Sequence, residues 1–357
     1  MKTRTLVLTV KDIRNIVQAI GLDELMDEMI KGLKNTLEHY NPDKNKQISR
    51  DGFHYYTPDF GLIEWMPIHK DSQVTLKTVG YHPNNPQTNN LPTILSTIST
   101  YDTRTGHLLG LADATFLTAL RTGAASAVAS KILANPQSVN IGLIGCGAQA
   151  VTQLHALSRV YDIEKVWLFD THMETAQKLP QKINFIDVDF QIVDNNNLAK
   201  LLGSVDVLCT CTSEKPGHGP VFSPSIYQSH LHINAIGADF PGKTELPLAL
   251  LEKAKVIPDY IPQATKEGEC QQLDEIQIST DLVGLVQRSE EYNDFQTQLT
   301  VFDSTGWALE DDVALRLLLD LAKELKIGTE LELECVSEDP KNPYQFIDNS
   351  LSMAKKA

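Results

Sequence analysis

A short apolar run that ends in a glycine turn is the feature that most constrains this chain. The run Val139–Ile144 precedes a GxGxxA turn at 145–150, and a helical pattern follows over Ala148–Val160. A strand, this turn and a helix, in that order, form the phosphate-binding unit of dinucleotide-binding folds. Gly145 would make the tight turn, and Gly147 would let the main chain approach a pyrophosphate. The candidate loop residues are Gly145, Gly147, Ala148 and Gln149.

Apolar strands continue to alternate with helical segments after this turn. They are Lys165–Phe169, Phe190–Val193, Val205–Thr210, His230–Gly237 and Lys255–Pro258. Fully apolar strands that alternate with helices are typical of a parallel sheet covered on both faces. We therefore predict an α/β fold, with a Rossmann-type doubly wound parallel sheet of six strands in a domain spanning 130–310.

The cofactor that this unit favours is NAD. Asp170 ends the second strand, where its carboxylate can accept hydrogen bonds from the adenosine ribose and repel a 2′-phosphate. Thr171 and His172 follow it, rather than an Arg or Lys that would favour NADP. Thr210 and Thr212, at the end of the fourth strand, would lie near the cofactor or serve a purely structural role. The alternative is a glycine turn that binds no nucleotide, with Asp170 capping a helix.

The remainder of the chain predicts a second α+β domain, formed by 1–129 together with 311–357. Its expected strands are Thr5–Val10, Gly61–Ile68, Val74–Tyr81 and Leu95–Tyr101, with a further strand resuming at Leu108. Two long helical patterns, Ala114–Ala134 and Trp307–Ile327, flank the dinucleotide domain.

Composition narrows the partners and the compartment. The chain has 31 Lys plus Arg against 46 Asp plus Glu, a formal net charge of −15, so nucleic-acid binding is not expected. No apolar stretch approaches the 18 residues of a membrane helix. The five cysteines form no CxxC pair, so we expect reduced, buried cysteines, a cytoplasmic protein and no metal site.

Asp239 lies in a loop after the fifth strand, at the sheet edge where substrates of doubly wound folds bind, and its carboxylate would face the nicotinamide pocket. From the residues alone it is either a group of that pocket or a loop cap. The run 232–246, HINAIGADFPGKTEL, is very similar to the corresponding loop of the ornithine cyclodeaminase/μ-crystallin family. Further matches follow in the same order along the chain: Gly61–Pro67, Gly80–Pro83, Leu120–Ser126, Gly268–Gln272 and Val301–Asp311.

The resemblance implies a site. It places Arg50, Lys77 and Arg121 as three cations that clamp an α-carboxylate, which agrees with the bidentate pairing that guanidinium groups offer. Asp239 and Lys77 would be catalytic, and Glu64 would meet the distal ammonium. Thr93 would add a polar contact, and the turn from Ser304 to Gly306 would lie near the nicotinamide.

The function implied by the resemblance is an ornithine cyclodeaminase in proline biosynthesis or arginine and ornithine catabolism. Bound NAD would remove a hydride from L-ornithine and return it after cyclisation, giving L-proline and ammonia. A homodimer formed through the first domain is also implied. The alternatives are an NAD-dependent amino-acid or opine dehydrogenase, a ketimine reductase, and a non-catalytic crystallin-like protein that binds a dinucleotide. Phe240, Trp65 and Trp307 are bulky within matched motifs and could alter the preference among ornithine, lysine and 2,4-diaminobutyrate.

Overall fold

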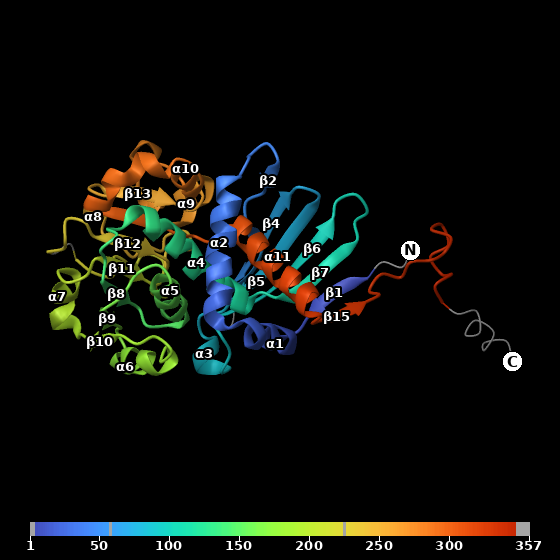
Figure 1. Ribbon diagram of the computed structural model, residues 1–357, viewed down its shortest axis with the longest axis horizontal. Helices are drawn as coiled ribbons and strands as arrows, with labels where there is room; N and C mark the ends of the chain where they lie inside the picture. Colours follow the sequence, from blue (N-terminus) through green and yellow to red (C-terminus); the bar gives the residue numbers. More distant parts are fainter. Residues whose placement is uncertain (1–3, 57–58, 224–225, 348–357) are drawn as a thin grey trace.

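Two β-sheets lie side by side, and one long buried helix runs between them (Figure 1). The computed structural model describes residues 4–56, 59–223 and 226–347. Residues 1–3 and 348–357 of the proposed second domain lie outside the described residues. The boundaries at 130 and 310 remain a prediction.

The second sheet in the chain is parallel throughout, with the order β10-β9-β8-β11-β12-β14-β13. Its strands are β8 (Asn140–Ile144), β9 (Lys165–Phe169), β10 (Asp189–Ile192), β11 (Val207–Thr210), β12 (His232–Ala235), β13 (Lys255–Pro258) and β14 (Thr300–Asp303). Its helices are α5 (Ala148–Ser158), α6 (Met173–Lys182), α7 (Leu198–Leu202), α8 (Leu248–Leu251), α9 (Ile261–Glu267) and α10 (Leu282–Gln287). Short 3-10 segments lie at Asn195–Asn197, Glu269–Gln272, Glu275–Gln277 and Ser289–Thr297. The predicted doubly wound α/β fold is confirmed.

The expectation of six parallel strands was wrong, because the described residues contain seven. The missed strand is β14, which inserts between β12 and β13. It has four residues and is fully buried, so it offers no alternation to detect. Its place next to β12 matters, because it brings Ser304 and Gly306 to the same sheet edge as the Asp239 loop.

The first sheet is mostly antiparallel, with the order β15-β1-β7-β6-β5-β4-β2 and with β3 also pairing with β4. Its strands are β1 (Thr5–Leu8), β2 (Asn45–Gln47), β3 (Asp51–Tyr55), β4 (Gly61–Lys70), β5 (Gln73–Tyr81), β6 (Ile94–Asp102), β7 (Leu108–Asp113) and β15 (Thr329–Leu331). The helices beside it are α1 (Val10–Ile20), α2 (Leu22–Glu38), α3 (Asn85–Thr88) and α11 (Ala308–Leu325). Burial alternates along β4, so that Leu62, Glu64 and Met66 face inward while Ile63 and Trp65 face outward.

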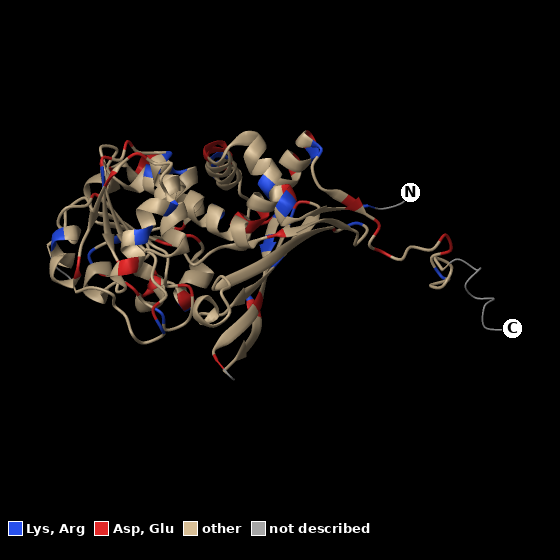
Figure 2. Ribbon diagram, turned by 90° about the horizontal axis from the view of Figure 1, so that it is seen from below, with Lys and Arg blue, Asp and Glu red and all other residues tan. Residues whose placement is uncertain are grey.

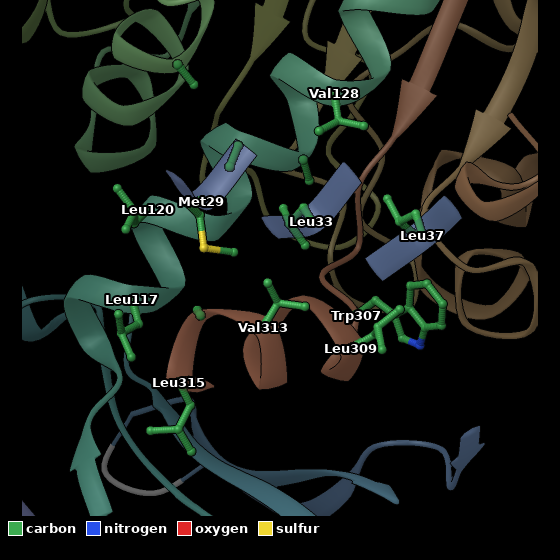
Figure 3. Packing of buried hydrophobic residues seen from close by; sticks show 14 of the residues in the cluster. Met29, Leu33, Leu37, Leu117, Leu120, Val128, Trp307, Leu309, Val313 and Leu315 are labelled. Carbon is green, nitrogen blue, oxygen red and sulfur yellow. The ribbon is translucent and has the colours of Figure 1, made fainter. Parts of the chain in front are cut away.

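Helix α4 (Thr115–Leu133) joins the two sheets and is buried along almost its whole length. Most of its residues are apolar or small and no face is strongly polar, as expected for a helix surrounded by protein. A side chain at Gly123 would place its Cβ 2.4 Å from the carbonyl oxygen of Thr152, so α4 and α5 are in close backbone contact there. The main core forms where α4 meets α2 and α11 (Figure 3).

Charged residues of both signs are scattered over both halves of the molecule (Figure 2). Among the described residues, no helix is long and apolar enough to cross a membrane. The expectation of buried cysteines was wrong for Cys335, which is exposed, while Cys211 is half-buried. Cys335 lies in the stretch after β15, which extends away from the body and so offers nothing to cover it (Figure 1).

Candidate active site

The glycine turn between β8 and α5 has the backbone that a phosphate loop needs. Gly145 has a φ of +89°, and an added Cβ there would lie 2.7 Å from the carbonyl oxygen of Cys211. Gly147 is exposed, and no atom would meet a Cβ within 4 Å. It caps α5 without a side-chain hydrogen bond, and Ala148 beside it is also exposed. The first N–H groups of an 11-residue helix therefore face open space, which suits a pyrophosphate.

Asp170 follows β9 and contacts this turn directly. Its carboxylate accepts hydrogen bonds from the N–H of Cys146 at 2.9 Å and from the N–H of His172 at 2.8 Å. An ionised carboxylate has about four lone-pair positions, so it retains capacity for ribose hydroxyls. Asp170 thus braces the glycine turn as well as marking the expected ribose position.

The other predicted cofactor residues line the carboxyl ends of β11 and β14. The hydroxyl of Thr210 donates to Glu245 at 2.6 Å, which commits this side chain to the protein. The hydroxyl oxygen of Ser304 is buried and makes no hydrogen bond within the described part of the chain, whereas the Thr212 side chain lies beside Glu245. Buried polar atoms without partners are uncommon in folded proteins. Together with the open glycine turn, the free hydroxyl of Ser304 fits a dinucleotide that runs along the carboxyl ends of these strands.

A buried carboxylate, Glu245, organises that edge and escaped the sequence analysis. It also accepts the N–H groups of Thr212 at 2.7 Å and Gly237 at 2.8 Å. Burial raises the pKa of Glu245, while these hydrogen bonds oppose the rise. Glu245 thus links the loops that follow β11 and β12.

A cavity of about 70 Å³ lies between the two sheets, next to the end of β14. It is lined by Arg50, Leu62, Glu64, Met66, Lys77, Val79, Tyr81, Ile94, Thr118, Arg121, Asp239, Phe240 and Thr305. The structure therefore brings Arg50, Glu64, Lys77, Arg121 and Asp239 together from five separate segments. Thr93 does not line the cavity. Its carbonyl accepts the N–H of His82 at 2.8 Å, and the neighbouring Ile94 contacts the cavity instead.

Two of the three cations are held by the first turn of α11. Lys77 Nζ lies 2.6 Å from Asp311 Oδ2, and Arg121 Nε donates to Asp311 Oδ1 at 3.1 Å. Arg121 Nη1 donates to Glu310 at 2.8 Å. All four side chains are buried. Acidic residues are common in the first turn of a helix, so sequence alone did not distinguish Glu310 and Asp311 from ordinary helix starts.

Arg50 precedes β3 and reaches across to the parallel sheet. Its Nη2 donates to the carbonyl oxygens of Thr305 at 2.6 Å and Gly306 at 3.2 Å. Its Nε lies 2.9 Å from Glu267 Oε1, an ion pair without hydrogen-bond alignment, and its Nη1 lies 3.9 Å from Glu64. Carboxylates and carbonyls thus orient the clamp before any ligand enters.

Burial shifts the proton affinities of this cluster toward neutral pH. Burial lowers the pKa of Lys77 to about 8, although Asp311 opposes the change. Burial raises the pKa of Glu267 to about 7 and that of Glu310 to about 8. Desolvation disfavours charged forms of both signs, which is why the lysine and the carboxyls move in opposite directions. Lys77 on the cavity wall, and the carboxyls of Glu267 and Glu310 that contact Arg50 and Arg121, therefore have pKa values near physiological pH.

Asp239 and Glu64 are the two carboxylates on the cavity wall. Asp239 Oδ1 accepts a hydrogen bond from Lys243 Nζ at 2.6 Å. Glu64 Oε1 lies 3.2 Å from Nε2 of His54. Glu267 and Lys243 are functional candidates that the sequence analysis missed, although both stand within or beside matched motifs.

Of the three bulky residues, the structure places only Phe240 on the cavity wall. Its ring packs against His54 at 5.4 Å and Phe60 at 5.8 Å between centroids. Trp307 is fully buried away from the cavity and stacks on Tyr260 at 5.1 Å. Trp65 packs against Phe53 on the outer face of the sheet. Phe240 is therefore the one whose size can act on a ligand directly.

Together, the fold and the site define a dinucleotide-binding protein with a charged cavity between its two sheets. The chain belongs to the ornithine cyclodeaminase/mu-crystallin family, whose sequence model matches residues 9–326. This family membership confirms the resemblance seen in the motifs.

Two curated relatives cover nearly the whole chain. An L-lysine cyclodeaminase of Streptomyces rapamycinicus is 41% identical over 346 residues, covering 96% of this chain and 100% of the relative. An ornithine cyclodeaminase of Agrobacterium tumefaciens is 32% identical over 341 residues, covering 95% and 93%.

Solved structures agree with this assignment. One match is the structure of a lysine cyclodeaminase that addresses recognition of L-lysine, L-ornithine and L-2,4-diaminobutyric acid. Its TM-score is 0.92 and its sequence identity is 43%, and the match covers 96% of this chain and 100% of that chain. A dimeric archaeal alanine dehydrogenase with bound NAD matches with a TM-score of 0.82 and 30% identity, over 93% and 100%. The family thus includes both cyclodeaminases and dehydrogenases.

Proposed function

We propose that the protein is an NAD-dependent cyclodeaminase that converts an L-diamino acid into a cyclic imino acid and ammonia. The observation that carries this proposal is the charge arrangement of the cavity. Three cations, Arg50, Lys77 and Arg121, suit an α-carboxylate, while Glu64 and Asp239 suit amino groups on the same small molecule.

The clamp fixes the substrate through its carboxylate. Within the described residues, neither Arg121 Nη2 nor Arg50 Nη1 makes a hydrogen bond, and Arg50 Nη1 lies 3.9 Å from Glu64 Oε2. These free donors, with the ammonium of Lys77, would hold the α-carboxylate against the end of β14. Because Thr305 and Gly306 accept from Arg50, the clamp is tied to the strand that borders the expected nicotinamide position.

Asp239 would carry the protons of the reaction. NAD⁺, held by the glycine turn at Gly145 and Gly147 and by Asp170, would supply the redox chemistry, which is hydride removal from the α-carbon of the substrate and hydride return to the cyclic imine. Between these events Asp239 accepts a proton from the terminal ammonium, whose freed lone pair attacks the α-carbon. Asp239 then returns a proton to the α-nitrogen, which leaves as ammonia.

We propose L-lysine as the first substrate to test, followed by L-ornithine and L-2,4-diaminobutyrate. The resemblance of the motifs pointed to ornithine, but the relative named for lysine is 41% identical and the one named for ornithine is 32% identical. Phe240 would set the chain length, because it stands beside Asp239 on the cavity wall.

We also propose a homodimer formed through the outer face of the first sheet, in a cytoplasmic protein. Ile63 on β4 is 43% exposed and Leu95 on β6 is 42% exposed, and Trp65 flanks Ile63 on that face. An apolar sheet face of this kind is typical of a contact surface. A sedimentation mass equal to that of one chain at micromolar concentration would contradict the dimer.

The function is tested by incubating the protein with each diamino acid and a trace of NAD⁺, and measuring the cyclic product, ammonia and NADH together. Product and ammonia in equal amounts, far above the NAD⁺ supplied and without accumulation of NADH, are the expected result. An oxo acid formed with stoichiometric NADH would instead make the protein a dehydrogenase. An Asp239→Asn variant serves as the matched control, because it keeps the shape of the loop and removes the base.

A further inference from the structure

Lys243 folds back onto Asp239 across a tight turn. The N–H of Lys243 donates to the carbonyl of Phe240 at 3.0 Å, and Gly242 has a φ of +82°, which lets the chain reverse. The lysine carbonyl accepts the side-chain N–H of Gln271 at 2.9 Å, which anchors the turn to the segment after α9. The ammonium then reaches Asp239 Oδ1 at 2.6 Å.

The ammonium of Lys243 lies directly behind the cavity wall. The residue is only 5% exposed, and its Nζ stands 5.6 Å from the centre of the Tyr81 ring. Asp239 and Tyr81 both line the cavity, whereas Lys243 itself does not. The positive charge of Lys243 therefore acts on any group that binds to Asp239, although Lys243 does not contact that group.

We propose that Lys243 is a positioning residue that keeps the terminal amine of the bound diamino acid in its neutral, nucleophilic form. This inference rests on the proposed cyclodeaminase function and deepens it. A positive charge behind Asp239 disfavours a second positive charge in front of it, so the substrate ammonium gives up its proton more readily. The same contact aims the Asp239 carboxylate that receives the proton.

The proton and bonding changes balance within the substrate and Asp239. The N–H proton moves from the terminal nitrogen to the carboxylate oxygen, and the freed electron pair forms the new bond to the oxidised α-carbon. The C=N electron pair of the oxidised substrate moves onto the α-nitrogen, which takes the proton back from Asp239. The ring nitrogen then gives its second N–H proton to Asp239, and the electron pair freed on it forms the C=N bond of the cyclic imine as the bond to the α-nitrogen breaks and ammonia leaves.

The surrounding charges are consistent with a cation at Lys243. Burial is the largest effect and opposes the charge, but Asp239, Tyr81 and Glu245 together outweigh it and raise the pKa of Lys243 above its ordinary value. Glu267 also interacts electrostatically with Asp239. The hydroxyl of Thr210 and two backbone N–H groups already occupy Glu245, so Asp239 is the carboxylate to which Lys243 is bonded.

The test compares Lys243→Met with Lys243→Arg, which keeps the charge, and Lys243→Gln, which keeps a donor without the charge. Lys178→Met removes a surface lysine paired with Glu174 at the same 2.6 Å and serves as the matched control. Turnover is measured against pH, together with NADH released per cyclic product. Reduction of NAD⁺ in one turnover with excess enzyme reports hydride removal separately from cyclisation.

The methionine and glutamine variants should lose at least tenfold in cyclic product near pH 7.5, and the acidic limb of their pH profile should move up by about one pH unit. Hydride removal should persist, so that NADH accumulates as the open-chain imine is hydrolysed to an oxo acid. The arginine variant should restore most of the cyclisation. An unchanged pH profile and NADH-to-product ratio in a folded Lys243→Met or Lys243→Gln protein would overturn the inference. Absence of cyclic product from the wild-type protein would instead contradict the proposed function.

Discussion

The charge on Lys77 should make carboxylate binding fall steeply on the alkaline side of neutrality. Burial lowers the pKa of this lysine to about 8, so its ammonium is largely intact at pH 7 and is lost as the pH rises through 8. The attraction of Lys77 for a carboxylate is therefore present below pH 8 and disappears above it. An exposed lysine, with its usual pKa near 10.4, would show no change in this range.

The size of the effect can be worked from the protonated fraction. Each pH unit above about 8 leaves about a tenth as much charged Lys77, so at pH 9.5 the dissociation constant should be about 30-fold higher than at pH 7. A hydrogen bond to a charged group contributes about 1.5–3 kcal/mol, so complete loss of the Lys77 charge can raise the dissociation constant by at most roughly 10-fold to 150-fold. The expected change lies within that ceiling.

The assay should use a ligand that does not titrate in this range. Cyclopentanecarboxylate has the ring and carboxylate of a cyclic product but no nitrogen, and its carboxyl group is ionised throughout. Its dissociation constant is measured by calorimetry from pH 7 to 9.5 on protein saturated with NADH. Lys77→Arg is the matched control, since a guanidinium stays charged at every pH used.

Glu267 and Glu310 also ionise between pH 7 and 8, and their negative charges weaken the binding of an anion. The wild-type protein and the Lys77→Arg variant share this contribution. The dissociation constant of the wild-type protein divided by that of the Lys77→Arg variant therefore reports the charge on Lys77 alone. This ratio should grow about tenfold per pH unit above 8. A ratio that stays constant from pH 7 to 9.5 would refute the reasoning, because it would mean that Lys77 keeps its proton or does not meet the carboxylate.

Three further outcomes are expected. Asp239→Asn should reduce turnover at least 100-fold while NADH binding, followed by fluorescence, stays within twofold; comparable turnover would remove Asp239 as the base. Asp170→Ala should weaken NAD⁺ binding about tenfold in a calorimetric titration, because both the ribose partner and the brace on Cys146 are lost; an unchanged affinity would mean that the ribose lies elsewhere. Gly123→Val should cost about 1–3 kcal/mol of unfolding free energy in a denaturant titration, since its Cβ would lie 2.4 Å from the Thr152 carbonyl oxygen. A smaller loss than in a Gly106→Val control, at an open turn with a φ of +79°, would contradict the close helix contact.

The dinucleotide half was predictable because its signals are local. A buried parallel strand, a glycine turn and an amphipathic helix are adjacent in the chain, so periodicity and turn chemistry suffice to find them. The strand β14 was missed because four buried residues carry no period. Its position between β12 and β13 depends on long-range pairing that sequence patterns do not reveal.

The cavity residues were predictable only through the family resemblance. Arg50, Lys77, Arg121 and Asp239 came from the family resemblance, and the structure brings them to one cavity. The carboxylates that hold them, Asp311 among them, are ordinary-looking residues at helix starts and loops. Their role arises from burial, which sequence composition does not reveal.

The pairing of β1 with β15 also has a consequence for biosynthesis. Strand β1 is made first, yet its antiparallel partner lies at 329–331, and α11 covers the same sheet only after the parallel half has been made. At about 5–20 residues per second, the ribosome would need roughly 15 to 65 s to supply that partner. The parallel half can fold during this interval, while the first sheet waits with an unpaired edge. Nascent chains should therefore depend on chaperones until release, and a circular permutant that joins residues 331 and 5 through a short linker should refold faster.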